Sequence, residues 1–280
     1  MKVGIIGYGF VGRALANGIK SEASIFKVDP KLKTSIEDLV SFDPDVIFIC
    51  VPTPLQKDLR IDPSIVFSVI EEILRFDFSS LIVLKSTILP NYLIDIQKKF
   101  KKFIYNPEFL REKHAEEDFI NSNMIVLGGD KKEINALKNF YTKYTKCISR
   151  DFIETDIVTA SLIKYTINTF LATKVSFFNE LKQIYKNINA SDSWENFISY
   201  LQKDNRMGSS HMSVPGHDGK KGFGGACLPK DSISMYNFAK EINLDLSVLK
   251  AAIDVNNGIR AEYNDDPREL EQRIRFNDKT

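Results

Sequence analysis

The sequence predicts an α/β fold in which an N-terminal domain with a doubly wound, mostly parallel sheet is followed by a mainly α-helical domain with a long central helix. Short apolar, β-branched runs alternate with helical spacings through the first half of the chain, which is typical of parallel sheets. The stretch 155–188 then lacks glycine and proline, and its middle is apolar nearly all round, which indicates a buried helix. Since 280 residues suffice for about two domains, we predict them over 1–150 and 151–280.

Composition narrows the possible functions. The chain has 38 Lys and Arg against 37 Asp and Glu, a formal net charge of +1, whereas nucleic-acid and anionic-membrane partners usually require a basic excess. Its three cysteines are widely spaced and odd in number, which favours a reduced, intracellular protein over a disulfide framework. No run approaches the ~18 consecutive apolar residues of a membrane span. We therefore expect a soluble, cytoplasmic protein with no nucleic-acid or membrane partner.

A glycine-rich loop near the N-terminus predicts a dinucleotide site. The strand 2–6 runs into Gly7–Gly12, with the spacing G-x-G-x-x-G, and a helix and a second strand, 24–28, lead to Asp29. In Rossmann domains such glycines bring the pyrophosphate to a helix N-terminus, and an acid about 20 residues on binds the ribose hydroxyls. Asp29 favours NAD over NADP, although Lys31 and Lys33 leave a 2′-phosphate possible. The alternative is a structural glycine turn.

Further strands are predicted to end in polar residues. Ligands of doubly wound sheets bind at the carboxyl ends of the strands, which makes Thr53, Thr87 and Glu108 candidates by position. Helix capping or turn chemistry is the alternative for each of them alone. The predicted strands cover 46–51, 81–84, 103–105 and 124–127, with a helix over 65–74.

The second half contributes a lysine, an asparagine and a cysteine. Lys164 and Asn168 lie four residues apart on the apolar helix, so they share a face suited to developing negative charge; a snorkelling lysine with a surface asparagine is the alternative. Cys227 is expected just before a helix that starts at Pro229, with Lys230 nearby, conditions that favour a thiolate. Cys50 and Cys147 are interpreted as buried, hydrophobic residues. His211 and His217 with Cys227 match no metal-site spacing, and we predict no metal.

These motifs together resemble the UDP-glucose/GDP-mannose dehydrogenase family. They occur in the family's order over nearly the whole chain, and the cysteine-centred motif is the most specific of them. The matching segments are Gly7–Gly12, Val51–Pro54, Lys85–Thr87, Asn106–Glu112, Lys164–Tyr165, Asn168, Asn179–Glu180, Asp204–Gly208 and Phe223–Asp231.

The resemblance implies an NAD-dependent, four-electron oxidation of a nucleotide sugar, UDP-glucose to UDP-glucuronate being favoured, and a place in polysaccharide biosynthesis. The alcohol becomes an aldehyde, and Cys227 then carries a thiohemiacetal and a thioester that water hydrolyses. The implied catalytic residues are Cys227, Lys164, Asn168, Asp231, Thr87 and Glu108. Those implied for the cofactor are Gly7, Gly9, Phe10, Val11, Gly12, Asp29, Val51, Pro52, Thr53, Ser86, Thr87 and Lys230. Those implied for the substrate are Glu108, Phe109, Leu110, Arg111, Glu112, Lys164, Asn168, Arg206, Phe223, Gly224 and Gly225.

The sequence also departs from the family. Ser161 and Lys113 stand where family members usually have glutamate and glycine, and the loop before Cys227 is longer. Relatives continue into a third domain that closes on the nucleotide, and we expect this domain to be missing here. A homodimer packed through the helical domain is expected. Two other functions remain open: a non-catalytic or partner-dependent binding remnant of the family, and a short β-hydroxyacid dehydrogenase, which needs no cysteine.

Overall fold

The computed structural model describes residues 1–276, which form two compact units. Unit 1 contains Met1–Thr53 and Asp62–Lys164, and unit 2 contains Pro54–Ile61 and the chain from Tyr165 onward. The division falls inside the long helix α7 (Ile157–Asn187) and not at residue 150. The last strand of the sheet and the first residues of α7 therefore belong to unit 1.

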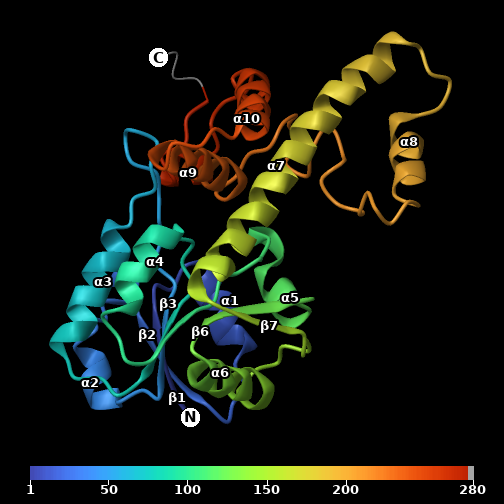
Figure 1. Cartoon of the computed structure of the whole chain (residues 1–280). Helices are drawn as coiled ribbons and strands as arrows, with labels where there is room; N and C mark the ends of the chain where they lie inside the picture. Colours follow the sequence, from blue (N-terminus) through green and yellow to red (C-terminus); the bar gives the residue numbers. More distant parts are fainter. Residues whose placement is uncertain (277–280) are drawn as a thin grey trace. The chain divides into compact units, whose positions relative to one another are not determined.

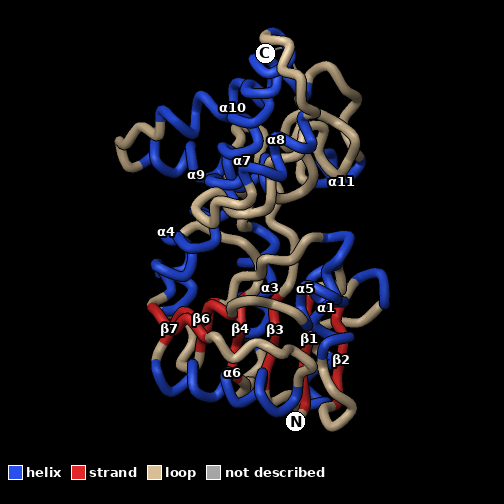
Figure 2. The backbone as a smooth tube through the Cα atoms, turned by 90° about the vertical axis from the view of Figure 1, so that its right-hand side faces the viewer, coloured by secondary structure: helices blue, strands red, loops and turns tan. Residues whose placement is uncertain are grey.

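Unit 1 is built on one seven-stranded sheet with the strand order β2-β1-β3-β4-β5-β6-β7 (Figures 1 and 2). All neighbouring strands are parallel except β5 and β6, so the predicted doubly wound, mostly parallel sheet is confirmed. The strands are β1 (Lys2–Ile6), β2 (Ser24–Val28), β3 (Val46–Ile49), β4 (Leu81–Leu84), β5 (Phe103–Tyr105), β6 (Ile125–Gly129) and β7 (Phe152–Thr155).

Two apolar clusters cover the two faces of this sheet. Side chains alternate between the faces along a strand, so Ile5 and Phe48 join one cluster while Ile6 and Ile49 join the other. Burial on both faces explains why these strands are continuous apolar runs in the sequence. The helical segments of unit 1 are α1 (Phe10–Gly18), η1 (Pro30–Leu32), α2 (Asp38–Phe42), α3 (Ser64–Arg75), α4 (Pro90–Gln97), η2 (Glu112–His114), α5 (Ala115–Ile120) and α6 (Lys131–Tyr144).

Two boundaries differ from the sequence prediction for local reasons. The strand expected over 46–51 ends at Ile49, since pairing with β4 stops at Leu84 and a proline follows at position 52. The helix expected from residue 155 begins at Ile157, because Phe152–Thr155 forms the edge strand β7. The sequence of β7, Phe-Ile-Glu-Thr, has neither the long apolar run nor the clean alternation that predicts a strand. This agrees with its place at the edge of the sheet, where all four residues are half-buried.

Unit 2 is helical, as predicted. Beyond its share of α7 it contains α8 (Trp194–Leu201), α9 (Leu228–Glu241), α10 (Ser247–Arg260) and the short α11 (Pro267–Glu271). The segment Pro54–Ile61 joins this unit through hydrogen bonds, among them the Leu55 amide to the Gln272 carbonyl at 3.1 Å. Within residues 1–276, no helix is long and apolar enough to cross a membrane.

Candidate active site

The glycine loop in unit 1 leaves no room for side chains where its backbone turns. Gly7 has a φ of +90°, in the region that favours glycine. A Cβ on Gly12 would stand 2.1 Å from the Gly7 carbonyl oxygen, whereas a Cβ on Gly9 would meet no described atom within 4 Å. Gly9 is the N-cap of α1, so the open side of the loop faces the helix N-terminus, which favours an anion. This cradle fits the pyrophosphate of a dinucleotide.

Asp29 lies at the end of β2 and is tied to the same loop. One carboxylate oxygen accepts a hydrogen bond from the Tyr8 amide at 2.7 Å, and the other accepts one from the Lys31 amide at 2.9 Å. The strand end, the carboxylate and the glycine loop are thereby held in one arrangement.

The loops after β3 and β4 are joined to each other. The Thr53 hydroxyl donates to the Thr87 carbonyl at 2.8 Å, and the Ser86 hydroxyl donates to the Val51 carbonyl at 2.7 Å. The structure therefore brings together the residues predicted for the cofactor after these two strands. The Thr53 and Ser86 hydroxyls both donate to backbone carbonyls, and these hydrogen bonds fix the shape of this edge of the sheet.

Glu108 and Lys164 form a buried pair. The Lys164 ammonium donates to the Glu108 carbonyl at 2.7 Å and lies 3.4 Å from its carboxylate, and the side chains are only 6% and 3% exposed. The second carboxylate oxygen accepts from the Leu110 amide at 2.6 Å. The Lys164 ammonium also lies 5.3 Å from the Phe109 ring centroid. A buried charge pair is retained only with such additional hydrogen bonds, so Glu108 and Lys164 hold a defined geometry.

Lys85 and Asn106, which lie in two of the segments that resemble the family, belong to a buried polar network to which the sequence analysis assigned no role. The buried Lys85 ammonium and the Tyr141 hydroxyl both donate to the Asn106 side-chain oxygen, at 3.0 and 2.6 Å. Burial lowers the pKa of Lys85 from its ordinary value. The contacts themselves carried no sequence signal, since Lys85, Asn106 and Tyr141 come from distant elements. The network fixes Asn106, two residues before Glu108.

The two other cysteines are buried as expected. Burial raises the pKa of Cys50 to about 12 and raises the pKa of Cys147 as well. Both thiols are therefore poor nucleophiles.

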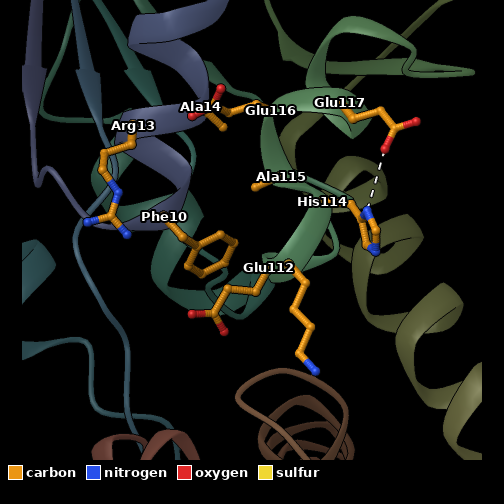
Figure 3. Close-up of a pocket in the computed structure, with 9 residues that line it drawn as sticks. Phe10, Arg13, Ala14, Glu112, His114, Ala115, Glu116 and Glu117 are labelled. Carbon is orange, nitrogen blue, oxygen red and sulfur yellow. Dashed lines mark ion pairs between the residues drawn. The ribbon is translucent and has the colours of Figure 1, made fainter. Parts of the chain in front are cut away.

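A pocket of about 390 Å³ opens between α1 and the η2–α5 segment (Figure 3). It brings together Phe10 and Glu112, predicted for cofactor and substrate respectively, and adds Arg13 and His114, which the sequence did not single out. The full lining is Phe10, Arg13, Ala14, Glu112, Lys113, His114, Ala115, Glu116 and Glu117. Arg111, predicted for the substrate, instead pairs with Asp118 at 2.7 Å.

Unit 2 holds Cys227 at the N-cap of α9. The thiol is half-buried, and the Asp231 amide donates to the Cys227 carbonyl at 2.9 Å in the first helical turn. The buried Asp231 carboxylate accepts from the Asn168 amide at 2.5 Å and from the Lys230 ammonium at 2.6 Å. Asn168, Asp231 and Lys230, all predicted site residues, are thus linked by hydrogen bonds beside the first turn of α9. Lys230, predicted for the cofactor, is committed to Asp231 in unit 2.

Other predicted substrate residues of unit 2 have partners of their own. Arg206 is exposed and pairs with Asp204 at 2.6 Å. The amides of Phe223 and Gly225 donate to the Asn256 and Glu269 side chains, at 2.6 and 3.0 Å. Within the part of the chain that the structure describes, no three His, Cys, Asp or Glu residues are grouped to hold a metal ion.

Comparison with known families bears on both units. Residues 22–145 match the NAD binding domain of the UDP-glucose/GDP-mannose dehydrogenase family, and residues 158–258 match its central domain. The chain belongs to this family. Unit 1 therefore contains its NAD-binding domain, and NAD is the cofactor.

Individual relatives agree with this assignment. UDP-glucose 6-dehydrogenase of Rickettsia bellii is 36% identical over 220 residues, which are 76% of this chain and 49% of the relative. The enzyme of the same name from Rickettsia conorii is 34% identical over 251 residues, covering 82% of this chain and 55% of the relative. The chain thus spans about half the length of the curated relatives it matches.

Solved structures of dehydrogenases have a similar fold. A UDP-glucose dehydrogenase from Pyrobaculum islandicum has a TM-score of 0.79 and 26% identity, with 92% of this chain and 68% of that chain covered. A 3-hydroxyisobutyrate dehydrogenase from Mycobacterium tuberculosis has a TM-score of 0.72 and covers 94% of this chain and 95% of that chain. At 14% identity, the second likeness concerns the fold alone.

Proposed function

We propose that this chain is an NAD-dependent nucleotide-sugar dehydrogenase that oxidises UDP-glucose to UDP-glucuronate in two steps through a covalent intermediate on Cys227. The observation that carries the proposal is the half-buried thiol at the N-cap of α9, next to the buried Asn168, Asp231 and Lys230. A helix N-terminus and a nearby ammonium favour the thiolate over the thiol.

The first step removes two electrons from the primary alcohol of the sugar. NAD supplies, when bound, the acceptor for one hydride in each of the two oxidations. The alcohol also loses its hydroxyl proton, and Lys164 and Asn168 stabilise the negative charge on that oxygen. In unit 1 the Glu108 carbonyl and carboxylate fix the Lys164 ammonium for this role. The product is the aldehyde.

The second step is covalent. The Cys227 thiolate adds to the aldehyde carbon, and the resulting oxyanion takes a proton to give the thiohemiacetal. Loss of a hydride and of the hydroxyl proton then gives the thioester. Water adds to the thioester carbon and the thiolate leaves, which yields the carboxylate. We assign Asp231 and Thr87 to positioning or activating that water, and Glu108 to its proton transfer.

The substrate is assigned to the residues that the resemblance implies. Glu108, Phe109, Leu110 and Glu112 line or flank pockets of unit 1, while Arg206 and the loop Phe223–Gly225 belong to unit 2. Because the Phe223 and Gly225 amides and the Phe223 carbonyl are bound by side chains, we expect the sugar to use the Gly224 and Gly225 carbonyls of this loop. Arg206 is one exposed cation that suits a diphosphate.

We also propose that the chain is a homodimer formed through α7. Phe170, Phe177 and Ile184 follow one another at seven-residue intervals on this helix, and they are 65%, 56% and 58% exposed. A seven-residue repeat keeps apolar side chains on one side of a helix, where a second helix with the same repeat packs against them. A second copy of this chain offers such a helix.

The decisive experiment counts NADH formed per sugar nucleotide consumed, over a panel of UDP- and GDP-sugars. We expect two NADH per UDP-glucose for the wild type, at most one for Cys227→Ser, and two for Cys147→Ala, a matched removal of a buried thiol. One NADH per substrate and no effect of Cys227→Ser would instead indicate a one-step hydroxyacid dehydrogenase. No NADH from any sugar, with NAD binding intact, would refute the catalytic proposal and favour a binding or partner-dependent function.

A further inference from the structure

The loop that precedes Cys227 is held by side chains from three different helices. The Gly222 amide donates to Asn179 of α7 at 3.1 Å, the Phe223 amide to Asn256 of α10 at 2.6 Å, and the Gly225 amide to Glu269 of α11 at 3.0 Å. The Asn256 amide also donates to the Phe223 carbonyl at 3.0 Å. All three accepting side chains are buried. The backbone of Gly222–Gly225 is therefore fixed by side chains of other elements.

Glu269 binds Gly225, the residue of the loop nearest to Cys227 among the three that are held, and its own carboxylate has further partners. It is 0% exposed, and its carboxylate lies 2.6 Å from the guanidinium of Arg260, which is 1% exposed. Arg260 also binds Asp218 at 2.7 Å. The second Glu269 oxygen accepts from the Asp266 amide at 2.8 Å. Buried charges need partners of this kind, and the contacts with the Gly225 amide, Arg260 and the Asp266 amide leave the Glu269 carboxylate one position.

The fit between this pair and the loop is tight. A Cβ on Gly224 would stand 2.1 Å from an Arg260 nitrogen and 2.4 Å from a Glu269 oxygen, so only glycine is accommodated there. Gly225 has a φ of +79°, again a glycine conformation. Cys227 follows two residues later at the N-cap of α9. The position of the thiol thus depends on where Glu269 holds Gly225.

Neither Arg260 nor Glu269 lies within the residues that match the family's central domain, which end at 258. We propose that Glu269, oriented by Arg260, is a positioning residue that fixes the Gly225 backbone and through it the Cys227 thiol for attack. The proposal deepens the proposed function and rests on it for the role of the thiol. An ion pair that only stabilises the fold is the competing explanation.

Three substitutions separate these explanations. Glu269→Gln keeps the length of the side chain and an oxygen for Gly225, giving up the bond to the Asp266 amide. Glu269→Asp keeps the charge for Arg260 but is one methylene too short to hold Gly225 as well. Glu269→Ala removes both contacts. The matched control is Glu271→Ala, an exposed glutamate of the same helix.

Two measurements report on the thiol. In the first, iodoacetamide alkylation of Cys227 is followed by peptide mass spectrometry across pH, which requires no substrate. We expect the pH at which alkylation is half-maximal to rise by up to about one unit in Glu269→Asp and Glu269→Ala. It should stay unchanged in Glu269→Gln and in Glu271→Ala. In the second, kcat for NADH formation falls on the order of 10²-fold in Asp and Ala with KM for the sugar nucleotide unchanged, and in Gln by less than about tenfold.

The order of the variants decides the outcome. The proposal would be overturned if folded Glu269→Asp kept the wild-type alkylation midpoint and the wild-type kcat. It would also be overturned if kcat fell further in Glu269→Gln than in Glu269→Asp, because that order is expected when only the charge of Glu269 matters. If the Ala variant does not fold, the Asp and Gln pair still decides, because both keep a polar partner for Arg260. A wild-type enzyme that makes no NADH would refute the proposed function, while the alkylation midpoints would still test the positioning.

Discussion

At the scale of single residues, the cofactor loop and the cysteine loop solve the same problem in different ways. Gly7–Gly12 is shaped by the absence of side chains and by one carboxylate, Asp29, that accepts from the Tyr8 amide. The loop before Cys227 also uses glycines, but side chains from other helices occupy its amides. The first loop keeps its helix N-terminus open for a ligand, and the second is locked so that one thiol keeps its position.

Gly12→Ala tests the cofactor loop. The added methyl group would meet the Gly7 carbonyl oxygen at 2.1 Å, so the loop must shift where the pyrophosphate approaches. We expect NAD to bind at least about tenfold more weakly, which is about 1.4 kcal/mol, in a calorimetric titration. Gly258→Ala is the matched control, because a Cβ at that exposed helical position meets no described atom within 4 Å. Equal NAD affinity in both variants would show that the loop does not carry the cofactor.

How much of the site the sequence predicts depends on how local its signals are. Gly7–Gly12 with Asp29, and Cys227 with Pro229, are short patterns whose physics is contained in one strand, turn or helix end. Glu269 carries no such signal, because its partner Gly225 is 44 positions away. Lys85 likewise acquires its role only when Asn106 and Tyr141 come together around it. Supporting residues of this kind follow from tertiary packing, which a single sequence does not reveal.

At the scale of elements, α7 is the structure that both units share. Its start is fixed by Asp156, whose carboxylate accepts from the Val158 and Thr159 amides at 2.8 and 2.9 Å and from the Thr159 hydroxyl at 2.7 Å. The residues before Asp156 form β7, a half-buried edge strand that the sequence pattern did not predict. The antiparallel pairing of β5 with β6 was also not predictable, because strand direction follows from how the chain crosses the sheet.

Asp156→Ala tests this helix start. We expect a loss of about 1 kcal/mol in the free energy of unfolding at neutral pH, the usual cost of an N-cap. The Thr159 hydroxyl holds the pKa of Asp156 below its ordinary value of 3.8. A carboxylate with a lowered folded pKa stabilises the protein above its unfolded pKa and loses this effect as pH falls through the folded pKa.

The difference in the free energy of unfolding between wild type and Asp156→Ala is therefore expected to be constant from about pH 7 to pH 5 and to shrink below pH 3.8. Urea unfolding at these pH values measures it. Asp151→Ala, on an exposed aspartate of the same segment, is the control and should change stability little. A difference that persists unchanged at the lowest pH would mean that the ionised carboxylate is not what caps the helix.

At the scale of the whole molecule, the two units divide the proposed chemistry between them. Unit 1 holds the dinucleotide loop and the Glu108–Lys164 pair, while unit 2 holds Cys227 and the chain Asn168–Asp231–Lys230. Lys164 and Asn168 stand one helical turn apart on α7, on either side of the division. An element that carries residues of both groups must keep its own position well defined, and association of α7 with a second copy would restrain it further.

Phe177→Asp tests that association. Phe177 lies in the middle of the exposed repeat Phe170, Phe177 and Ile184, so a carboxylate there places two like charges, one from each copy, in an apolar contact. We expect the wild type to sediment as a dimer and the variant as a monomer over the same concentration range. Gln183→Asp adds the same charge at an exposed position of the same helix outside the repeat, and it should remain dimeric. A wild type that is monomeric at the highest concentration, or a Phe177→Asp dimer as stable as wild type, would contradict the assignment of this surface.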